Sequence, residues 1–462
     1  MPSTSFGTFE QPFSATSYWN RRPLGVRLGN AEIPDSQYYP LVGEGSYSSA
    51  AFLCSTNDQP MRIVGPSGSA GVWNLDAEEH QPEVVIPRWP ANAVPATGSD
   101  GHCDIVDPLA GVIHSLFKLR KNAEGQWVAA MYAWTELRGR GWGDPAHYYQ
   151  GARAAAVPPI AGLIRKHEVN DGLPFYRHAL SMSLTYNGLS SQTPYVFPAT
   201  SADTDWQLNT GFIPEGSLLM LPDWFDTGSI ANLDLRKVAN TLKLYGGYVV
   251  DRNVGTPFYI YVENGSNFNL HKGGWNTAVA NDLKRIQRAL RPVVEVQSWV
   301  DGYGRTGAFR ERLNLLSMRG PWVRVKGQGN ARFDTLIQSV RFEGASEGSE
   351  FEHRNNRSMA SVSWAPVKPG ARYRVSVQAA DSALFQLRFM NPSTWQVVMQ
   401  TDWLGSGRQR DFIWPSQPVR VVPCIRSGNV MLPDDTSVKA PWIRAQLIQV
   451  DDGFQSPWLV TA

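Results

Sequence analysis

The stretch that decides the fold is DGHCDIVDPLAGVIHSLFKL, residues 100–119. Two runs rich in apolar and β-branched residues, 103–106 and 112–119, flank a segment of turn-forming residues, 107–111. This pattern predicts a β-hairpin. Similar runs, separated by Gly, Pro, Asn and Asp, recur through residues 13–300, as at 82–86, 103–106, 112–119, 127–134, 179–185 and 258–262. Such spacing is typical of a β-sandwich or barrel.

Two segments depart from the β pattern. Apolar residues recur at helical spacing in residues 232–244, which are followed by Gly246-Gly247, and in residues 277–291, which are followed by Pro292. We expect two helices on the flank of the sandwich, with apolar stripes that serve the core. The first helix leads into Tyr248-Val249-Val250-Asp251, a predicted strand with the aspartate at its end.

A second β series begins after residue 302, with runs at 322–325, 335–342, 373–377, 384–389, 419–422 and 442–450. We therefore predict a mainly β protein, in which a sandwich or jelly-roll-like domain with two flanking helices precedes a second jelly-roll-type domain. The expected boundaries are an N-terminal arm at 1–20, a glycan-handling sandwich at 21–300 and a carbohydrate-binding or oligomerisation domain at 301–462.

Composition excludes several classes of function. The 462 residues carry 43 basic and 41 acidic side chains, a net charge of +2 without charge blocks, so nothing predicts nucleic-acid binding. No run approaches the roughly 18 apolar residues of a membrane span, so we expect no membrane insertion. The three cysteines, Cys54, Cys103 and Cys424, lie too far apart for the usual zinc motifs, and their odd number argues against a disulfide framework.

The first candidate site is the segment before the predicted turn. Alternation places Asp100, His102 and Asp104 on one face of a strand, and a three-residue loop at 108–110 would set His114 opposite Asp104. Carboxylates and imidazoles held together supply an acid and a base at neutral pH. No cofactor is predicted, although Asp100, His102 and Asp104 could also hold a divalent cation. Turn caps and core hydrogen bonds are the plain structural alternative.

Two further residues are candidates for catalysis. His178 begins the predicted strand 178–184 and faces its interior, where a structural role is also common. Asp251 could pair with Asp104 in a glycoside hydrolase, as could Asp100. In a polysaccharide lyase, His102 would instead take the C5 proton of a uronate.

Aromatic residues supply the second half of a glycan site, because sugar rings pack on flat aromatic faces. The chain contains 17 Trp and 16 Tyr. Trp206 in Asp203-Thr204-Asp205-Trp206 combines an indole with carboxylates that accept hydroxyl hydrogen bonds, and Trp224 has similar neighbours. The predicted substrate-binding residues are His114, Trp134, Trp142, Trp206 and Tyr248, each of which could also be a core residue.

Several short motifs carry a resemblance to a known family. They are Ser14-Ala15-Thr16-Ser17-Tyr18-Trp19-Asn20, Ser99-Asp100-Gly101-His102, Asp104-Ile105-Val106-Asp107-Pro108, Pro159-Ile160-Ala161-Gly162-Leu163-Ile164-Arg165, Arg177-His178-Ala179-Leu180, Phe197-Pro198-Ala199-Thr200 and Tyr245-Gly246-Gly247-Tyr248-Val249-Val250-Asp251. Residues 10–270 thereby resemble a largely uncharacterised family of bacterial secreted β-sandwich proteins. The resemblance implies polysaccharide handling. His114-Ser115 departs from the family, whose members have a Tyr-Glu pair there.

The ends of the chain suggest a biological setting. Residues 1–20 lack the basic and apolar regions of a secretory signal, yet the composition resembles that of extracellular carbohydrate-active proteins. The absence of such a signal, together with the second β domain, resembles the organisation of a bacteriophage tailspike or tail fibre. The resemblance implies a virion protein, commonly a homotrimer bound to other tail proteins, that binds and depolymerises a bacterial capsule or O-antigen. The alternative is a non-catalytic glycan-binding or structural tail protein.

Overall fold

The computed structural model describes residues 5–75, 77, 79–144, 147, 149–307, 314–335, 338–354, 358–359, 365–380, 382–428 and 441–450. The chain divides into two compact units: unit 1 (residues 1–144 and 149–309) and unit 2 (residues 310–454 with 145–148). Strands dominate both units, and both described α-helices belong to unit 1. The prediction of a mainly β protein with two helices is confirmed.

The largest sheet of unit 1 carries most of the candidate residues. Its strand order is β1-β17-β14-β15-β13-β16-β2, with β18 paired to β17. The strands are β1 (Arg22–Leu28), β2 (Leu41–Gly43), β13 (Leu180–Thr185), β14 (Leu218–Met220), β15 (Gly247–Asn253), β16 (Phe258–Tyr261), β17 (Arg291–Val300) and β18 (Thr306–Gly307). β15 runs parallel to β13, while β13 and β16 are antiparallel.

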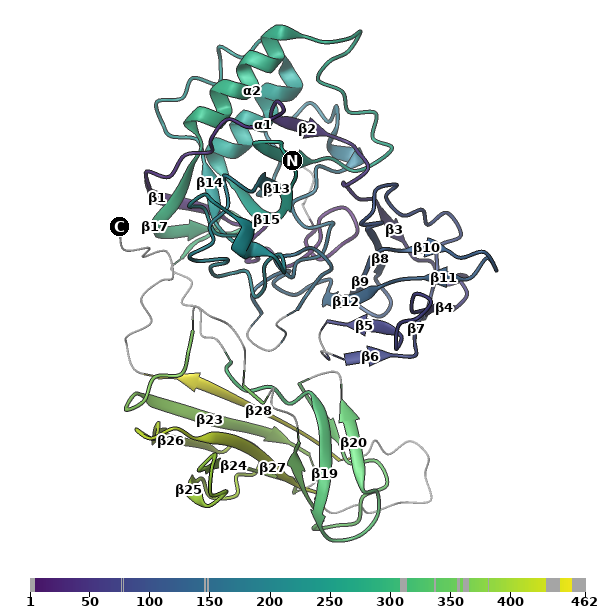
Figure 1. Ribbon diagram of the computed structural model, residues 1–462, viewed down its shortest axis with the longest axis vertical. Helices are drawn as coiled ribbons and strands as arrows, with labels where there is room; N and C mark the ends of the chain where they lie inside the picture. Colours follow the sequence, from purple (N-terminus) through teal and green to yellow (C-terminus); the bar gives the residue numbers. More distant parts are fainter. Residues whose placement is uncertain are drawn as a thin grey trace. The chain divides into compact units, whose positions relative to one another are not determined.

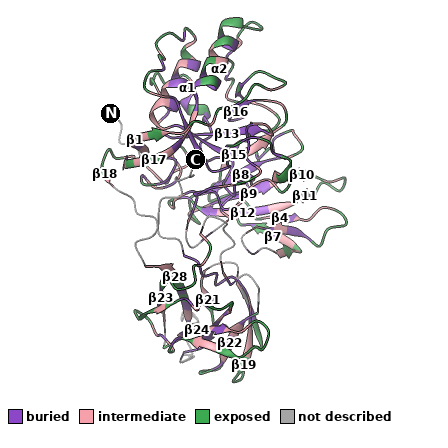
Figure 2. Ribbon diagram, turned by 60° about the vertical axis from the view of Figure 1, so that its left-hand side comes forward, coloured by how far each residue is buried: buried purple, intermediate pink, exposed green. Residues whose placement is uncertain are grey.

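Two helices cover this sheet, as Figures 1 and 2 show. They are α1 (Leu233–Leu244) and α2 (Thr277–Ala289), close to the predicted ranges. The side chain of Asn232 caps α1, and Gly246, with a φ of 78°, turns the chain from α1 into β15. Apolar residues of both helices share one buried core with β13, β15 and β16.

Two smaller sheets complete unit 1. Their strand orders are β3-β8-β9-β12-β5-β6 and β10-β11-β4-β7. The strands are β3 (Ala51–Leu53), β4 (Met61–Val64), β5 (Val72–Asn74), β6 (Glu79–Gln81), β7 (Glu83–Ile86), β8 (Cys103–Asp107), β9 (Val112–Phe117), β10 (Arg120–Lys121), β11 (Trp127–Val128) and β12 (Met131–Glu136). The predicted strand at 127–134 is thus two strands, β11 and β12, in different sheets.

The predicted hairpin forms between β8 and β9, but without the three-residue loop on which the pairing of His114 with Asp104 depended. Asp107 pairs with Val112, so the loop is residues 108–111 rather than 108–110. Asp104 therefore stands opposite Ser115, while His114 pairs with Ile105. Because neighbouring residues of a strand point to opposite faces, the additional loop residue places His114 on the other face from Asp104.

The described residues of unit 2 form two β-sheets with the orders β20-β19-β22-β27-β24-β25 and β21-β28-β23-β26. The strands are β19 (Gly320–Lys326), β20 (Arg332–Thr335), β21 (Val340–Arg341), β22 (Glu350–His353), β23 (Arg372–Ala379), β24 (Leu384–Met390), β25 (Val397–Gln400), β26 (Gln409–Ile413), β27 (Arg420–Arg426) and β28 (Trp442–Gln449). Tyr373 of β23 and Phe389 of β24 are both fully buried. Trp414 packs against both rings and joins the two sheets through one aromatic core.

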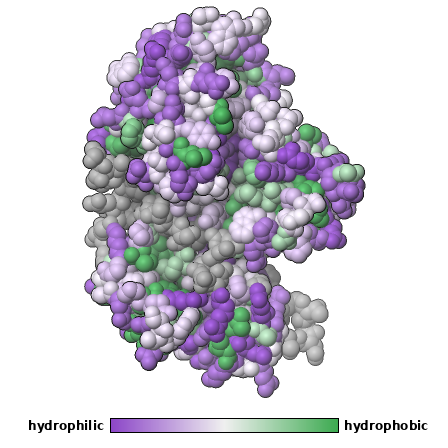
Figure 3. All heavy atoms as spheres, in the orientation of Figure 1, coloured by the Kyte–Doolittle hydropathy of each residue, from purple (hydrophilic) through white to green (hydrophobic). Residues whose placement is uncertain are grey.

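The N-terminal segment, predicted as an arm, packs into unit 1. Phe13, Tyr18 and Trp19 are at most 1% exposed. On the face shown in Figure 3, hydrophobic residues form small groups among polar ones. No helix in the described ranges is long and apolar enough to cross a membrane.

Candidate functional site

Asp104 is an internal anchor rather than an accessible acid. It is completely buried in β8, and its Oδ2 accepts a hydrogen bond from the backbone N–H of Ile160 at 2.5 Å. Burial raises the pKa of this carboxyl to about 7. The contact attaches the segment around Ile160 to the hairpin, but Asp104 itself cannot reach a ligand from outside in this conformation.

His102 and Asp100 precede β8 and differ in exposure. His102 is 1% exposed, and burial, together with the charge of Arg153, lowers its pKa, so the imidazole is neutral. Asp100 is half-buried. Gly101, with a φ of 46°, lies between them and breaks the regular alternation that predicted one shared face. Of the three predicted residues, only Asp100 has appreciable solvent access.

Asp251 lies in the second half of β15, two residues before its end and next to an irregularity in the sheet. Met182 pairs with Val249 and Ser183 pairs with Asp251, so Val250 is an additional residue in β15. A bulge of this kind redirects the following side chains and is common beside active sites. The side chain of Asp251 is 14% exposed. Asp251 is therefore the predicted catalytic residue that best combines burial with access.

The bulge also positions Arg153. The carbonyl of Val250 accepts a hydrogen bond from the N–H of Ala155 at 3.2 Å, which fixes the loop that carries Arg153. Arg153 Nη1 donates to Asp251 Oδ2 at 3.0 Å, and the guanidinium lies 3.8 Å from the centre of the Tyr261 ring. The side chain of Arg153 is 1% exposed. Arg153 is thus a buried cation held between a carboxylate and an aromatic face.

The motif that contains Trp206 meets the same strand. Arg252, which follows Asp251, places Nη2 at 2.5 Å from Asp205 Oδ1 and at 3.8 Å from Asp203 Oδ1. The side chains of Asp203 and Asp205 are 25% and 51% exposed. The predicted combination of aspartates and Trp206 therefore lies beside Asp251, although no sequence pattern placed the two together.

A third carboxyl, that of Glu215, is buried behind Asp203. It is 1% exposed, and its Oε1 accepts a hydrogen bond from the N–H of Asp203 at 3.2 Å. Gly216 donates to the carbonyl of Val249 at 2.7 Å, so the segment that carries Glu215 runs along β15. Gly216 has a φ of 90°, and a Cβ there would lie 2.1 Å from the carbonyl of Val196. Only glycine fits this turn.

Asp203, Glu215 and Asp251 form what we call the carboxylate cluster. Burial and the charge of Asp203 raise the pKa of Asp251 to about 7, against the opposing effect of Arg153. Burial and the charges of Asp203 and Asp251 raise the pKa of Glu215 well above its usual range. The pKa of Asp203 is raised by burial, partly offset by Arg252. Such a cluster holds protons at neutral pH that isolated carboxyls would release.

His178 makes a different kind of contact. Its Nε2 donates to Glu168 Oε2 at 3.1 Å, and its Nδ1 donates to the carbonyl of Ala179 at 2.8 Å. Both partners are acceptors, so the ring is a buried imidazolium paired with a carboxylate. Burial alone would lower the pKa of His178, but the charge of Glu168 together with the hydrogen bonds to Glu168 and Ala179 outweighs it and raises the pKa. With both nitrogens engaged, His178 serves the structure rather than proton transfer.

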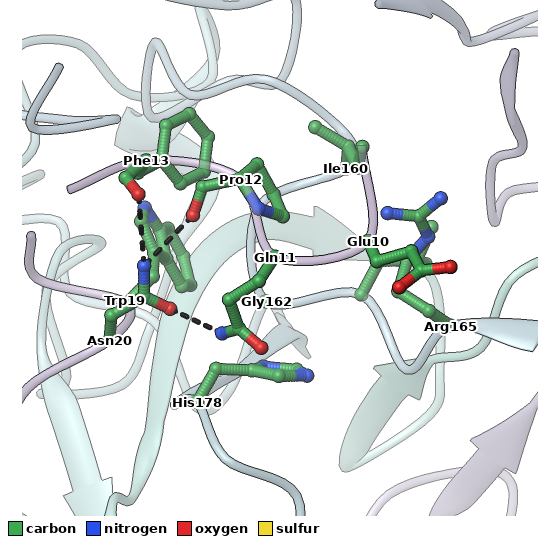
Figure 4. Close-up of a pocket in the computed structure, with 11 residues that line it drawn as sticks. Glu10, Gln11, Pro12, Phe13, Trp19, Asn20, Ile160, Gly162, Arg165 and His178 are labelled. Carbon is green, nitrogen blue, oxygen red and sulfur yellow. Dashed lines mark hydrogen bonds between the residues drawn. The ribbon is translucent and has the colours of Figure 1, made fainter. Parts of the chain in front are cut away.

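A small pocket of about 260 Å³, including its open mouth, lies beside His178. Figure 4 shows its wall, where Gln11 Nε2 donates to Asn20 Oδ1 at 2.6 Å. Arg165, also in the lining, is held by Glu263 at 2.9 Å. Gln11, Asn20 and Arg165 therefore already have partners within unit 1, so the pocket offers a ligand few free polar groups.

The predicted aromatic residues have divided roles. Trp142 and Tyr248 are completely buried, with Trp142 stacked on Trp19 at 5.5 Å, so the structure corrects their predicted contact with a sugar. His114 is 6% exposed and its Nδ1 lies 2.9 Å from the hydroxyl of Tyr132, which also makes it a core residue. Trp134 and Trp206 are partly exposed. Trp206 alone lies within a motif that reaches the carboxylate cluster.

Whether a metal ion can bind depends on how the ligand side chains are grouped. Among the described residues, no group of three or more His, Cys, Asp or Glu side chains is arranged to hold a metal. The predicted alternative of a cation at Asp100, His102 and Asp104 therefore has no matching site in the structure.

Comparisons with known proteins leave the family open. No family model matches the chain, and no curated protein matches it. The solved structures with a likeness include a glycosylation-associated protein (Gap123) complex from Streptococcus agalactiae, with 16% identity over 28% of this chain and 44% of that chain, and a TM-score of 0.16. A structure described as "CBM4 structure and function" has 17% identity over 28% of this chain and 93% of that chain, and a TM-score of 0.15. The resemblance drawn from the motifs stays a prediction.

Proposed function

We propose that unit 1 is a glycoside hydrolase unit whose acid and base come from the carboxylate cluster. One observation carries this proposal: the pKa values of Asp203, Glu215 and Asp251 are all raised, mainly by burial and with the charge of Asp203 contributing at the other two carboxyls, while Asp203 and Asp251 keep access to solvent. Glycoside hydrolysis needs two carboxyl groups in different protonation states. Enzymes commonly produce that difference by burial and by mutual repulsion.

The proposed roles follow from the partners of each carboxyl. Asp251, with a pKa of about 7, donates its proton to the glycosidic oxygen as the bond to the anomeric carbon breaks. Asp203, whose Oδ1 lies 3.8 Å from Arg252 Nη2, is the proposed second carboxyl, which either activates a water or attacks the anomeric carbon. Glu215 has no solvent access and positions Asp203 through its backbone N–H. A water molecule supplies the hydroxyl that bonds to the anomeric carbon. Its proton replaces the one that Asp251 gives to the leaving oxygen.

The charge balance supports hydrolysis over elimination. A lyase neutralises a uronate carboxylate with a free cation, but Arg153 and Arg252 already pair with carboxylates of this protein. His102, the preferred base for elimination in the sequence, is 1% exposed. We therefore propose that the sugar at the point of cleavage is neutral.

A bacterial surface polysaccharide, a capsule or an O-antigen, is the proposed substrate. The virion location, the homotrimer and the contacts with other tail proteins stay predictions from the sequence.

The alternative, glycan binding without cleavage, is favoured by an aromatic residue of unit 2. Trp395 is 51% exposed, and the guanidinium of Arg420 lies 4.8 Å from the ring centre, so the indole is held with part of its surface open.

The test is incubation of the full chain with purified capsules and O-polysaccharides, followed by assays for new reducing ends and for unsaturated uronates. We expect reducing ends without unsaturated uronates. Unsaturated products would contradict hydrolysis and favour a lyase. Binding of a polysaccharide with no product of either kind, across the panel, would favour the non-catalytic alternative.

A further inference from the structure

Three rings from two segments of unit 1 meet at its surface, and we call Tyr39, His271 and Trp275 the aromatic platform. The rings of His271 and Trp275 are 4.8 Å apart and nearly parallel, at 7°. Tyr39 meets Trp275 edge to face at 5.1 Å. The Nζ of Lys284, on α2, lies 4.7 Å from the centre of the Tyr39 ring. Trp275 is thus held by two ring contacts.

The platform is nevertheless open to solvent. Trp275 is 62% exposed and Tyr39 is 45% exposed. Burial of apolar surface in the core therefore does not account for an indole at this position. A ring that is both fixed and exposed can bind a flat partner without a large loss of conformational entropy.

The surroundings of the rings are polar. His271 Nδ1 accepts a hydrogen bond from the N–H of Asn276 at 3.0 Å, so the neutral ring carries its proton on Nε2. Lys272 is exposed and Lys284 is half-buried. An interface core for a protein partner would instead be apolar and depleted of lysine. A pyranose ring fits better, because its C–H face stacks on an indole while its hydroxyls bond to N–H groups at the edge.

The chain connects the platform to the strand of the carboxylate cluster. Tyr38, the neighbour of Tyr39, donates its N–H to the carbonyl of Gly255 at 2.8 Å. Gly255 follows β15 by two residues and Asp251 by four. The platform therefore adjoins the end of β15 at which Asp251 lies. The two sites share no residue, so one sugar ring that occupies the cluster leaves the platform free for another.

We propose that the aromatic platform is a second saccharide-binding site, which holds a distant sugar of a polymer whose bond is cleaved at the carboxylate cluster. This inference rests on the proposed function and names the substrate class as a polysaccharide rather than a short oligosaccharide. Trp275 stacks on the sugar, while Tyr39 and His271 fix the orientation of the indole. The platform contributes to affinity for long chains and takes no part in bond cleavage.

The test uses the full chain with the substitution Asp251→Asn, which prevents turnover. Affinity electrophoresis in dextran, laminarin, mannan and purified O-polysaccharides identifies a polymer that retards this chain. Trp275→Ala is then added, with Tyr303→Ala as the control, because Tyr303 is 60% exposed, is held by a ring contact with Phe6 and lies outside the platform. Trp275→Phe keeps an aromatic face. Circular dichroism checks that all variants fold.

We expect Trp275→Ala to weaken binding to the polymer about ten-fold, in the range of one lost aromatic contact. Tyr303→Ala should leave binding unchanged, and Trp275→Phe should restore most of the affinity that Trp275→Ala loses. Equal affinities of the Trp275→Ala and Tyr303→Ala chains would overturn the proposed platform, while hydrolysis by the native chain would still support the carboxylate cluster. Neither binding nor hydrolysis of any polymer by the native chain would contradict both proposals.

Discussion

The buried pair of His178 and Glu168 has a defined dependence on pH. The pKa of His178 is raised in the folded state, so its contribution is complete below about 6.5 and is lost as pH rises through the folded pKa. The pKa of Glu168 is lowered, so its contribution is present above about 4.5 and is lost as pH falls through its folded pKa. The pair should therefore stabilise unit 1 most between these limits.

We predict that His178→Gln lowers the free energy of unfolding by about 3 kcal/mol near pH 5.5, because it leaves a buried carboxylate without its charged partner. The loss should be smaller at pH 8. Urea titrations at both pH values measure the difference. The control is Asp282→Asn, which removes a partly exposed pair with Arg285 and should cost less than about 1 kcal/mol. A His178→Gln loss that does not change with pH would contradict the assigned imidazolium.

The sequence identifies some residues of the carboxylate cluster and its surroundings and misses others for physical reasons. Asp251 at the end of a strand and the aspartates beside Trp206 are visible as motifs. Glu215 and Arg153 are not, because each reaches the cluster through a backbone contact with the bulged strand, Gly216 with Val249 and Ala155 with Val250. Bulges and non-local contacts leave no periodic signal in the sequence.

At the scale of elements, the start of α1 depends on a single side chain. The Oδ1 of Asn232 accepts the N–H of Leu235 at 2.9 Å and satisfies a donor that has no partner within the helix. We predict that Asn232→Ala lowers the free energy of unfolding by about 1 kcal/mol, and that Asn232→Asp restores most of it because aspartate is also a good cap. Thermal denaturation measures both. An alanine variant as stable as the native chain would show that the cap contributes nothing.

Elements with strong local signals were predicted well, and those set by pairing were not. Apolar spacing and the terminal signals at Gly246-Gly247 and Pro292 predicted both helices. The loop of the β8–β9 hairpin is one residue longer than the three-residue loop considered in the sequence, because residues 107–111 contain Pro and Gly that fit loops of either length. The split of 127–134 into β11 and β12 arises because the chain crosses between two sheets at residues 129–130.

At the scale of the whole molecule, the fold class can be predicted from the pattern of apolar residues along the chain, and the position of the candidate site cannot. Alternating runs predicted a mainly β chain with two helices, as found. The carboxylate cluster instead combines β15 with loops around residues 153, 203 and 215, which lie up to about 100 positions away in the sequence. Packing alone brings these segments together, and local patterns do not encode it.

The same assembly predicts how activity depends on pH. Asp251 must carry a proton to act as the general acid, and its pKa is about 7. Hydrolysis of a susceptible polysaccharide should therefore decline as pH rises above about 7. This alkaline limb belongs to the cluster as a unit, because the charge of Asp203 contributes to it.

The most direct measurement is the pH dependence of reducing-end release by the native chain, by Asp251→Asn and by the control Asp226→Asn, whose exposed carboxyl lies in the other Trp-Asp motif. We predict that Asp251→Asn lowers the rate roughly 10²–10⁴-fold and removes the alkaline limb, while Asp226→Asn keeps the native profile. An Asp251→Asn chain that retains the native rate and pH profile would contradict the assignment of the carboxylate cluster as the catalytic centre.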